Sequence, residues 1–252
     1  MLKTRVMPCL LLRESKLVKT VKFKNPDYVG DPINAVMIYN EKEVDELIFL
    51  AITATVEGQK PPFKTIHEIA TECFMPFTYG GGIDNIEDMR RIFSLGVEKI
   101  AINSYAVKNP AILTEAAKQF GSQSIVASID VRKTGPDSYE VFTHSGKRKT
   151  GLDPVKWGKT VETLGAGEIL LTSIDKDGTM EGYDTNIISK VAGAVNIPIV
   201  ACGGAGKIED FGEAVAAGAS AVAAGSMFVY HGPAKGVLIN FPSRESLMEI
   251  LE

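Results

Sequence analysis

Two copies of one glycine pattern occur in this chain, and their equal spacing limits the folds that it can form. Gly81-Gly82 is followed by Asn103-Ser104, and Gly203-Gly204 is followed by Gly225-Ser226. In each copy the serine stands 22 residues after the last glycine. This spacing predicts two similar half-chains, about residues 1–123 and 124–252, that assemble into one fold with an internal twofold repeat.

A matching apolar run opens each half. Val6–Leu11 in the first half corresponds to Ile125–Asp130 in the second, so one run ends in leucine and the other in a carboxylate. Reactions that move protons at two atoms can divide the work between two opposed carboxylates, one a general acid and the other a general base. Leucine can fill neither role. The mismatch therefore limits the chemistry that the fold retains.

Short apolar segments alternate with amphipathic ones about eight times along the chain. The apolar segments are hydrophobic on both faces and precede helix-like stretches, which predicts parallel strands covered by helices. Eight such units in 252 residues favour a closed (β/α)8 barrel, a single domain over residues 1–252. The expected strands are Arg5–Leu11, Glu46–Ile52, Met75–Tyr79, Val97–Asn103, Ser124–Asp130, Glu168–Ile174, Ile197–Ala201 and Ala219–Ala224.

Two of the helices have clear ends in the sequence. The first is expected over Asp84–Leu95, with Asp84 as its N-cap and Gly96 as its stop. The second is expected over Ile208–Ala217 and ends at Gly218. Both carry an apolar stripe at helical spacing, which is typical of helices that pack on a sheet.

Two long connections interrupt the alternation. Leu12–Gly30 is polar and basic, and it is expected to be a lid or a disordered loop. Arg132–Lys149 contains the β-type run Tyr139–Thr143 between turn residues, which predicts a small hairpin. Because both connections follow strands, we expect both at the catalytic face of the barrel.

Composition narrows the function classes. The net charge of −4 gives no argument for a nucleic-acid partner or an anionic membrane. The start of the chain lacks the apolar core of a signal peptide, and Ala214–Tyr230 is interpreted as packed helix, turn and strand rather than a membrane span. The cysteines have no metal or disulfide spacing and indicate reduced thiols in a cytoplasmic protein; they are Cys9, Cys73 and Cys202.

The histidines are scattered along the chain, so neither a metal site nor another cofactor is expected; they are His67, His144 and His231.

The glycine pairs and the serines that follow them predict two phosphate sites. In a barrel, loops after the last two strands commonly bind phosphate through exposed backbone N–H groups and a helix N-terminus. The repeat predicts a second site across the opening, so that a substrate with a phosphate at each end would fit. Asp177-Gly178-Thr179 can complete one site. The alternative is that the glycines only form tight turns.

Several motifs carry a resemblance to one family over essentially the whole chain. The chain resembles HisF, the cyclase subunit of imidazole glycerol phosphate synthase. The family implies a (β/α)8 barrel with two phosphate sites and a HisH-like glutaminase on the N-terminal face, whose ammonia crosses the barrel core to the substrate. The motifs are Tyr79–Ile83, Phe120–Gln123, Gly165–Asp175, Asp177–Thr179 and Gly203–Lys207.

The resemblance also implies site residues. Asp130 falls on a catalytic aspartate of the family and Lys19 on its loop lysine, which makes both candidate catalytic residues. Three family positions in the opening differ: Leu11 replaces the other catalytic aspartate, Ala51 an acidic residue and Cys202 a serine. Asp130 could alternatively be a strand-end carboxylate that hydrogen-bonds a loop. The implied phosphate and substrate positions are Gly82, Asn103, Ser104, Thr172, Asp177, Gly178, Gly204, Gly225 and Ser226.

Four charged residues occur at or near expected strand starts, which form the bottom of a barrel. They are Arg5, Glu46, Lys99 and Glu168. Charges that point inward there would need partners, and two cations with two anions can form a closed ring. All four match the charged gate through which ammonia enters the HisF family. The alternative is a set of solvated rim charges.

The first strand and the tail resemble HisF-like paralogues found with surface-polysaccharide genes. The segments are Met7–Leu12, His231–Pro233 and Val237–Pro242. This resemblance implies ammonia delivery for acetamidino-sugar synthesis, with a HisH-like glutaminase and a separate sugar amidotransferase. Three alternatives stay open: a histidine-pathway cyclase that uses Asp130, a conduit without chemistry of its own, and, more weakly, the related sugar-phosphate isomerase.

Overall fold

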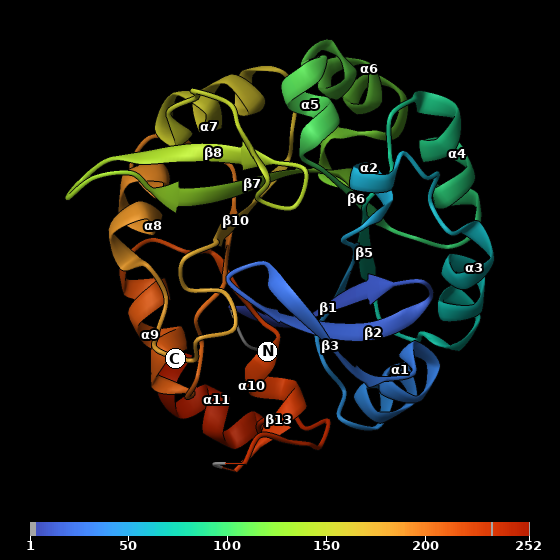
Figure 1. Ribbon diagram of the computed structural model, residues 1–252, viewed down its shortest axis with the longest axis vertical. Helices are drawn as coiled ribbons and strands as arrows, with labels where there is room; N and C mark the ends of the chain where they lie inside the picture. Colours follow the sequence, from blue (N-terminus) through green and yellow to red (C-terminus); the bar gives the residue numbers. More distant parts are fainter. Residues whose placement is uncertain (1–3, 233, 252) are drawn as a thin grey trace.

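A closed ring of eight parallel strands forms the centre of the protein (Figure 1), as the sequence predicts. The computed structural model describes residues 4–232 and 234–251; Met1–Lys3 and Pro233, which belongs to the tail motif, lie outside the described residues. Each strand pairs with the next, and the last, β12, returns to β1. In order around the barrel they are β1 (Arg5–Arg13), β4 (Leu47–Ala51), β5 (Phe77–Gly80), β6 (Lys99–Ile102), β7 (Ile125–Lys133), β10 (Glu168–Ser173), β11 (Ile199–Cys202) and β12 (Ala221–Ala224).

Helices surround the barrel and bury their apolar stripes against it (Figure 1). The longer ones are α1 (Pro32–Glu41), α3 (Phe63–Glu72), α4 (Ile86–Ser94), α6 (Ala111–Phe120), α7 (Pro154–Thr163), α8 (Thr185–Ala192), α9 (Glu209–Ala216) and α11 (Arg244–Leu251). Short helices follow three of the strands: α2 (Ala54–Glu57), α5 (Ser104–Lys108) and α10 (Ser226–Val229). The 3₁₀ turn η1 (Ser122–Ser124) lies between α6 and β7. Among the described residues, no helix combines the length and the apolar character that crossing a bilayer requires.

One predicted helix cap is wrong. Asn85, not Asp84, is the N-cap of α4: its side chain accepts a hydrogen bond from the Asp88 N–H. Asp84 instead pairs with Lys60, whose Nζ lies 2.8 Å from Asp84 Oδ1. Either side chain could cap a helix.

The prediction for Leu12–Gly30 is also wrong, because this segment is an ordered hairpin. β2 (Lys16–Val21) pairs antiparallel with the end of β1, and β3 (Lys24–Gly30) pairs with β2. Both connecting turns place two non-glycine residues at positive φ, Glu14-Ser15 and Lys22-Phe23. Positive φ at both central residues is typical of tight hairpin turns, and these turns usually have the sequence Asn-Gly or Asp-Gly. Neither dipeptide occurs at these two turns, so the sequence does not predict the hairpin.

The predicted second hairpin is present. β8 (Tyr139–Thr143) runs antiparallel along the extension of β7, and β9 (Arg148–Lys149) pairs with β8. In Figure 1 both hairpins lie over the same end of the barrel. This end, where the eight strands finish, is called the mouth below.

The interior of the barrel is a separate apolar cluster from the one beneath the helices. It contains Met7, Cys9, Leu11, Val18, Ile48, Ala101, Val126, Leu170, Val200, Cys202, Ala221 and Ala223. Alternate strand residues point inward and fill the barrel in layers, so the centre is packed rather than open.

Candidate functional site

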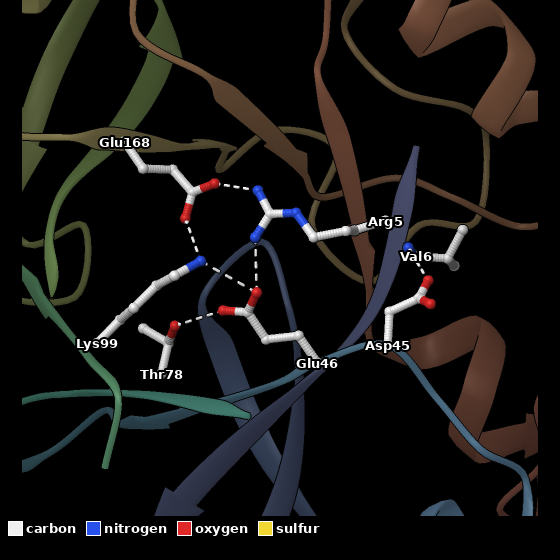
Figure 2. A network of polar contacts seen from close by, with 7 residues as sticks. All are labelled: Arg5, Val6, Asp45, Glu46, Thr78, Lys99 and Glu168. Carbon is white, nitrogen blue, oxygen red and sulfur yellow. Dashed lines mark hydrogen bonds and ion pairs between the residues drawn. The ribbon is translucent and has the colours of Figure 1, made fainter. Parts of the chain in front are cut away.

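Four charged side chains close a ring at the end of the barrel opposite the mouth, as Figure 2 shows. Arg5 Nη1 donates to Glu46 Oε2 at 2.6 Å, and its Nη2 donates to Glu168. Lys99 Nζ lies 3.0 Å from Glu46 Oε2 and 3.0 Å from Glu168 Oε2. Each cation therefore contacts both anions. We call Arg5, Glu46, Lys99 and Glu168 the charged ring.

The carboxylates of the charged ring are shielded from water, which argues against ordinary solvated rim charges. The side chains of Glu46 and Glu168 are 5% and 7% exposed. Thr78 Oγ1 donates to Glu46 Oε1 at 2.9 Å and so engages the second oxygen of that carboxylate. Burial acts to lower the pKa of Arg5, but the charges and hydrogen bonds of Glu168 and Glu46 outweigh it and raise the pKa. Mutual pairing thus compensates the cost of burying these charges.

A cavity of about 330 Å³ occupies the first-half side of the mouth. Gly81, Gly82, Asn103 and Ser104 line it, and we call these four residues the first cradle. Gly81 and Gly82 have φ of 114° and 72°. A Cβ at Gly81 would lie 2.4 Å from Ala51 O, so a side chain there would collide with backbone. Glycine lets the chain lie close to the neighbouring strand end and leaves room for a ligand.

The equivalent second cradle is formed by Gly203, Gly204, Gly225 and Ser226, and it differs in one respect. Its cavity holds only about 20 Å³. Lys19 of β2 fills the space: a Cβ built on Gly225 would lie 1.9 Å from Lys19 Nζ. Lys19 Nζ donates to the Cys9 carbonyl at 2.7 Å and is almost fully buried. The structure therefore brings Lys19 to the second cradle, on a strand rather than a loop.

Asp177 and Gly178 tie the first hairpin to the barrel. Asp177 Oδ2 accepts from Thr20 Oγ1 at 2.8 Å and from the Phe23 N–H at 3.3 Å. Burial raises the pKa of Asp177, while the charge of Lys19 and these two hydrogen bonds oppose the rise. A Cβ at Gly178 would lie 2.1 Å from Thr20 O, so glycine permits the contact. Asp177 also lines both cavities.

Asp130 lies on β7 and lines the larger cavity. Asn103 Nδ2 donates to Asp130 Oδ2 at 2.7 Å. Burial raises the pKa of Asp130 to about 7, the Asn103 hydrogen bond opposes the rise, and the charge of Asp177 adds to it. Thr172 of β10 pairs with Asp130 in the sheet and faces the same cavity. A carboxyl group that titrates near pH 7 can both give and accept protons.

Leu11 contributes an apolar side chain to this cavity. It pairs with Leu50 on β4 and with Val18 on β2, and it is 8% exposed. Its neighbours in the barrel interior are apolar. The wall that faces Asp130 from the first half therefore offers no titratable group at position 11.

Two thiols meet beneath the mouth. Cys9 and Cys202 are buried and free, and they share a hydrogen bond that lowers the pKa of Cys9 and raises that of Cys202 well above its ordinary value. For Cys9, burial opposes the shift, whereas for Cys202 it adds to it. Among the described residues, no group of three or more His, Cys, Asp or Glu side chains could hold a metal ion.

Comparison with known proteins places the chain in a family. The family model described as "Histidine biosynthesis protein" matches residues 5–234. The chain is 50% identical over 248 residues to a Pseudomonas aeruginosa protein provisionally named imidazole glycerol phosphate synthase subunit hisF2, with 98% of this chain and 99% of the relative covered. The chain belongs to the HisF family.

Other relatives have both kinds of name. A Vibrio vulnificus protein provisionally named subunit hisF3 is 48% identical over 257 residues, with 100% of this chain and 98% of the relative covered. Alkaliphilus metalliredigens imidazole glycerol phosphate synthase subunit HisF is 45% identical over 232 residues, with 92% of each chain covered. The predicted HisF resemblance is thus confirmed, as is the (β/α)8 barrel.

The three positions at which the resemblance implies a departure from the HisF pattern lie around one cavity. Leu11, Ala51 and Cys202 all line the larger cavity. Leu11 pairs with Leu50 and Leu12 with Ala51 on the neighbouring strand, so positions 11 and 51 lie on adjacent strand ends.

Sequence reasoning missed three basic groups of this cavity. Lys60, Lys108 and His144 line it together with the first cradle. Lys60 Nζ is already paired with Asp84 and Asp88, at 2.8 and 2.7 Å. The position of His144 in a predicted hairpin after a barrel strand was the available signal, because such insertions overhang the mouth.

Proposed function

We propose that this HisF-family chain is the ammonia-receiving, synthase-type subunit of a glutamine-dependent amidotransferase. Its partner is a HisH-like glutaminase docked over the charged ring. The observation that carries the proposal is the pairing of a complete charged ring at one end with a mouth in which Leu11 stands opposite Asp130. Reception of ammonia is retained, and the chemistry at the acceptor has changed.

The barrel interior supports passage of neutral ammonia. Between the charged ring and the mouth the axis is lined by apolar side chains, including Met7, Ile48 and Val126. An isolated ammonium ion would be costly to place there, whereas ammonia carries no charge. The charged ring is thus an entrance at which a proton is left behind, and the packed interior opens locally as the molecule passes.

The acceptor that we propose is a phosphate-bearing sugar derivative. The first cradle and its cavity support binding of a phosphate group, with Gly82, Ser104 and Thr172 as binding residues. The Leu11 segment and the tail resemble paralogues that serve acetamidino-sugar synthesis in surface glycans. A separate sugar amidotransferase would then take part in the complex.

The second candidate is a cyclase of histidine biosynthesis, which the name of the Alkaliphilus relative favours. The two separate in one assay: ammonia and the histidine-pathway ribonucleotide are supplied, and turnover is compared with that of an ordinary HisF. We expect turnover lower by about 100-fold or more, since one proton-transfer group is absent. Equal turnover would reject the sugar proposal.

The charged ring is tested separately with Lys99→Ala. We expect product formation driven by glutamine to fall more than product formation driven by added ammonium chloride, because free ammonia can also enter from the mouth. Lys64→Ala is the matched control, since Lys64 lies on α3 with a side chain that is 89% exposed. An equal loss with both nitrogen sources would count against an entrance at Lys99.

The alternative, a conduit without chemistry of its own, is tested with a substitution at Asp130. Asp130→Asn removes the titratable group of the mouth and keeps a side chain of similar size. If the reconstituted complex forms amidated product at the wild-type rate, the barrel only delivers ammonia. We expect a loss of about 100-fold or more in kcat.

A further inference from the structure

The turn that contains His144 returns to the mouth because of how β8 pairs. In the antiparallel β7–β8 ladder, Lys133 faces Tyr139 and Asp130 faces Phe142. The chain therefore leaves the barrel along β7 and comes back along β8. His144 follows two residues after Phe142, level with the end of the barrel rather than out in solvent.

Two hydrogen bonds fix this turn across the opening. The His144 N–H donates to Ser104 Oγ at 3.0 Å, and Ser145 Oγ donates to the Ile52 carbonyl. The turn therefore spans from the end of β6 to the residue after β4. His144 and Ser145 both have φ of 54°, a left-handed conformation that is uncommon outside glycine.

A neighbouring hydroxyl group fixes the orientation of the His144 imidazole. Its Nδ1 lies 3.0 Å from Thr143 Oγ1, a buried hydroxyl that holds one ring nitrogen. The side chain is half-buried and lines the same cavity as Asp130. Both residues are tied to one dipeptide, Asp130 to the Asn103 side chain and His144 to the Ser104 side chain.

The internal repeat gives this arrangement a counterpart. In the first half, the hairpin after β1 brings Lys19 to the second cradle, beside Gly225. In the second half, the hairpin after β7 brings His144 to the first cradle, beside Ser104. Each hairpin thus supplies one basic side chain to the cradle formed at the strands that come before its own strand around the barrel.

The charges around His144 favour its neutral form. Burial, then Arg148 of β9 and Lys108 of α5, lower the pKa of His144. Asp130 faces the cavity from β7, and Lys60 and Asp84 face it as an ion pair from the opposite side. A neutral imidazole accepts protons, whereas a carboxyl group with a pKa of about 7 is partly protonated and can donate them.

We propose that His144 is a catalytic residue of the mouth, the proton acceptor that works with Asp130 on the ligand bound at the first cradle. The assignment rests on the proposed function, in which ammonia is the nucleophile. As the nitrogen lone pair forms the new C–N bond, the nitrogen becomes positively charged and passes one proton to the His144 imidazole. The displaced π pair of the electrophilic C=O or C=N group goes to its oxygen or nitrogen, which takes a proton from Asp130. Solvent then returns a proton from the imidazolium to the carboxylate.

The decisive experiment is a pH–rate profile of the complex reconstituted with its glutaminase and sugar amidotransferase, supplied with ammonium chloride. We compare wild type, His144→Gln and His67→Gln, the last because His67 is exposed on the outer helix α3. We expect His144→Gln to lower kcat by about 100-fold or more, to leave KM for ammonia within about twofold, and to remove the limb of the profile that belongs to a histidine. A profile that coincides with that of wild type overturns the proposal.

A second measurement separates failure of this assignment from failure of the proposed function. The ¹³C-histidine NMR signals of the complete chain are titrated with pH, with and without inorganic phosphate, and assigned through His144→Gln. We expect the His144 midpoint to lie below the ordinary histidine value of about 6.5 and to rise when phosphate binds. If wild type forms no amidated product, the proposed function fails, but a His144 signal that responds to phosphate still supports its place at the ligand. A His144 signal that ignores bound phosphate overturns the assignment in either case.

Discussion

Strands β1 and β7 occupy equivalent places in the two halves, and each runs on into an antiparallel hairpin over the mouth. Leu11 pairs with Val18 in one hairpin, and Asp130 pairs with Phe142 in the other. The backbone hydrogen bonds of such ladders do not depend on the side chain. The architecture has therefore stayed twofold, while the side chains that point into the mouth have diverged.

The cradles diverge in the same way. A shared glycine frame surrounds an open cavity of about 330 Å³ in the first half, whereas in the second half Lys19 leaves only about 20 Å³. Glycines needed for close backbone approach change less readily than a side chain on an added hairpin. The two halves thus differ mainly in the side chains that their hairpins and strand ends place at the mouth.

The largest expected effect comes from adding a side chain at a glycine of either cradle. A Cβ at Gly204 would lie 2.2 Å from Gly182 O, and one at Gly82 would lie 2.8 Å from Gln59 O. We expect Gly204→Val to lower the free energy of unfolding by about 4 kcal/mol or more and Gly82→Val by about half as much, measured by urea denaturation.

Gly151→Val is the control for these variants, because Gly151 has φ of 73° but nothing within 4 Å of its Cβ position. Calorimetry with inorganic phosphate gives the second readout. We expect Gly82→Val to abolish binding at the first cradle. Retained binding would remove the argument that the glycine pair forms a phosphate site.

The next effect concerns the pH dependence that Asp130 gives to the second half. The folded pKa of Asp130, about 7, lies above the value of about 3.9 for an unfolded aspartate. The folded state therefore binds more protons between pH 4 and 7, and this group's contribution to stability falls as pH rises through that window. Asp130→Asn should remove up to about 4 kcal/mol of this decline, seen as a flatter curve of unfolding free energy from pH 4 to 8. Parallel curves for variant and wild type would show that Asp130 is not desolvated.

The smallest effect restores the symmetry of the two halves. Leu11→Asp puts a carboxylate among apolar neighbours, and we expect it to lower the free energy of unfolding by about 1–3 kcal/mol. The loss should be greater at pH 8 than at pH 5, because the charged form is the costly one. Leu11→Asn, which does not titrate, is the control and should show no such difference. A gain in turnover of the histidine-pathway ribonucleotide would show that position 11 alone limits the cyclase reaction.

The sequence predicts the barrel because its signals are local and repeated. Each expected strand is present, with ends shifted by a few residues, and α9 (Glu209–Ala216) falls within the expected Ile208–Ala217. Apolar runs, helix stripes and glycine stops act over a few neighbouring residues. The fold follows from their number and order.

The parts of the site that the sequence does not reveal depend on contacts between distant segments. In the sequence the first hairpin resembles a polar loop, because a lysine such as Lys19 does not indicate a buried strand position. In the structure the charge of Lys19 is buried against the Cys9 carbonyl and near Asp177. His144 looks isolated because it reaches Ser104 only after β8 has folded back along β7. The pairing of Cys9 with Cys202 likewise requires the closed barrel.

The lysine in the second cradle has a consequence for how a long substrate would enter. For a ligand with an anionic group at each end, as the proposed function implies, the first cradle adjoins a cavity of about 330 Å³, whereas the Lys19 ammonium fills most of the second cradle. The first end of such a ligand would settle beneath His144, and its second end would then have to draw Lys19 away from the Cys9 carbonyl. Under the proposed function, we therefore expect a molecule with only one anionic end to fit the first cradle without displacing Lys19 from the Cys9 carbonyl.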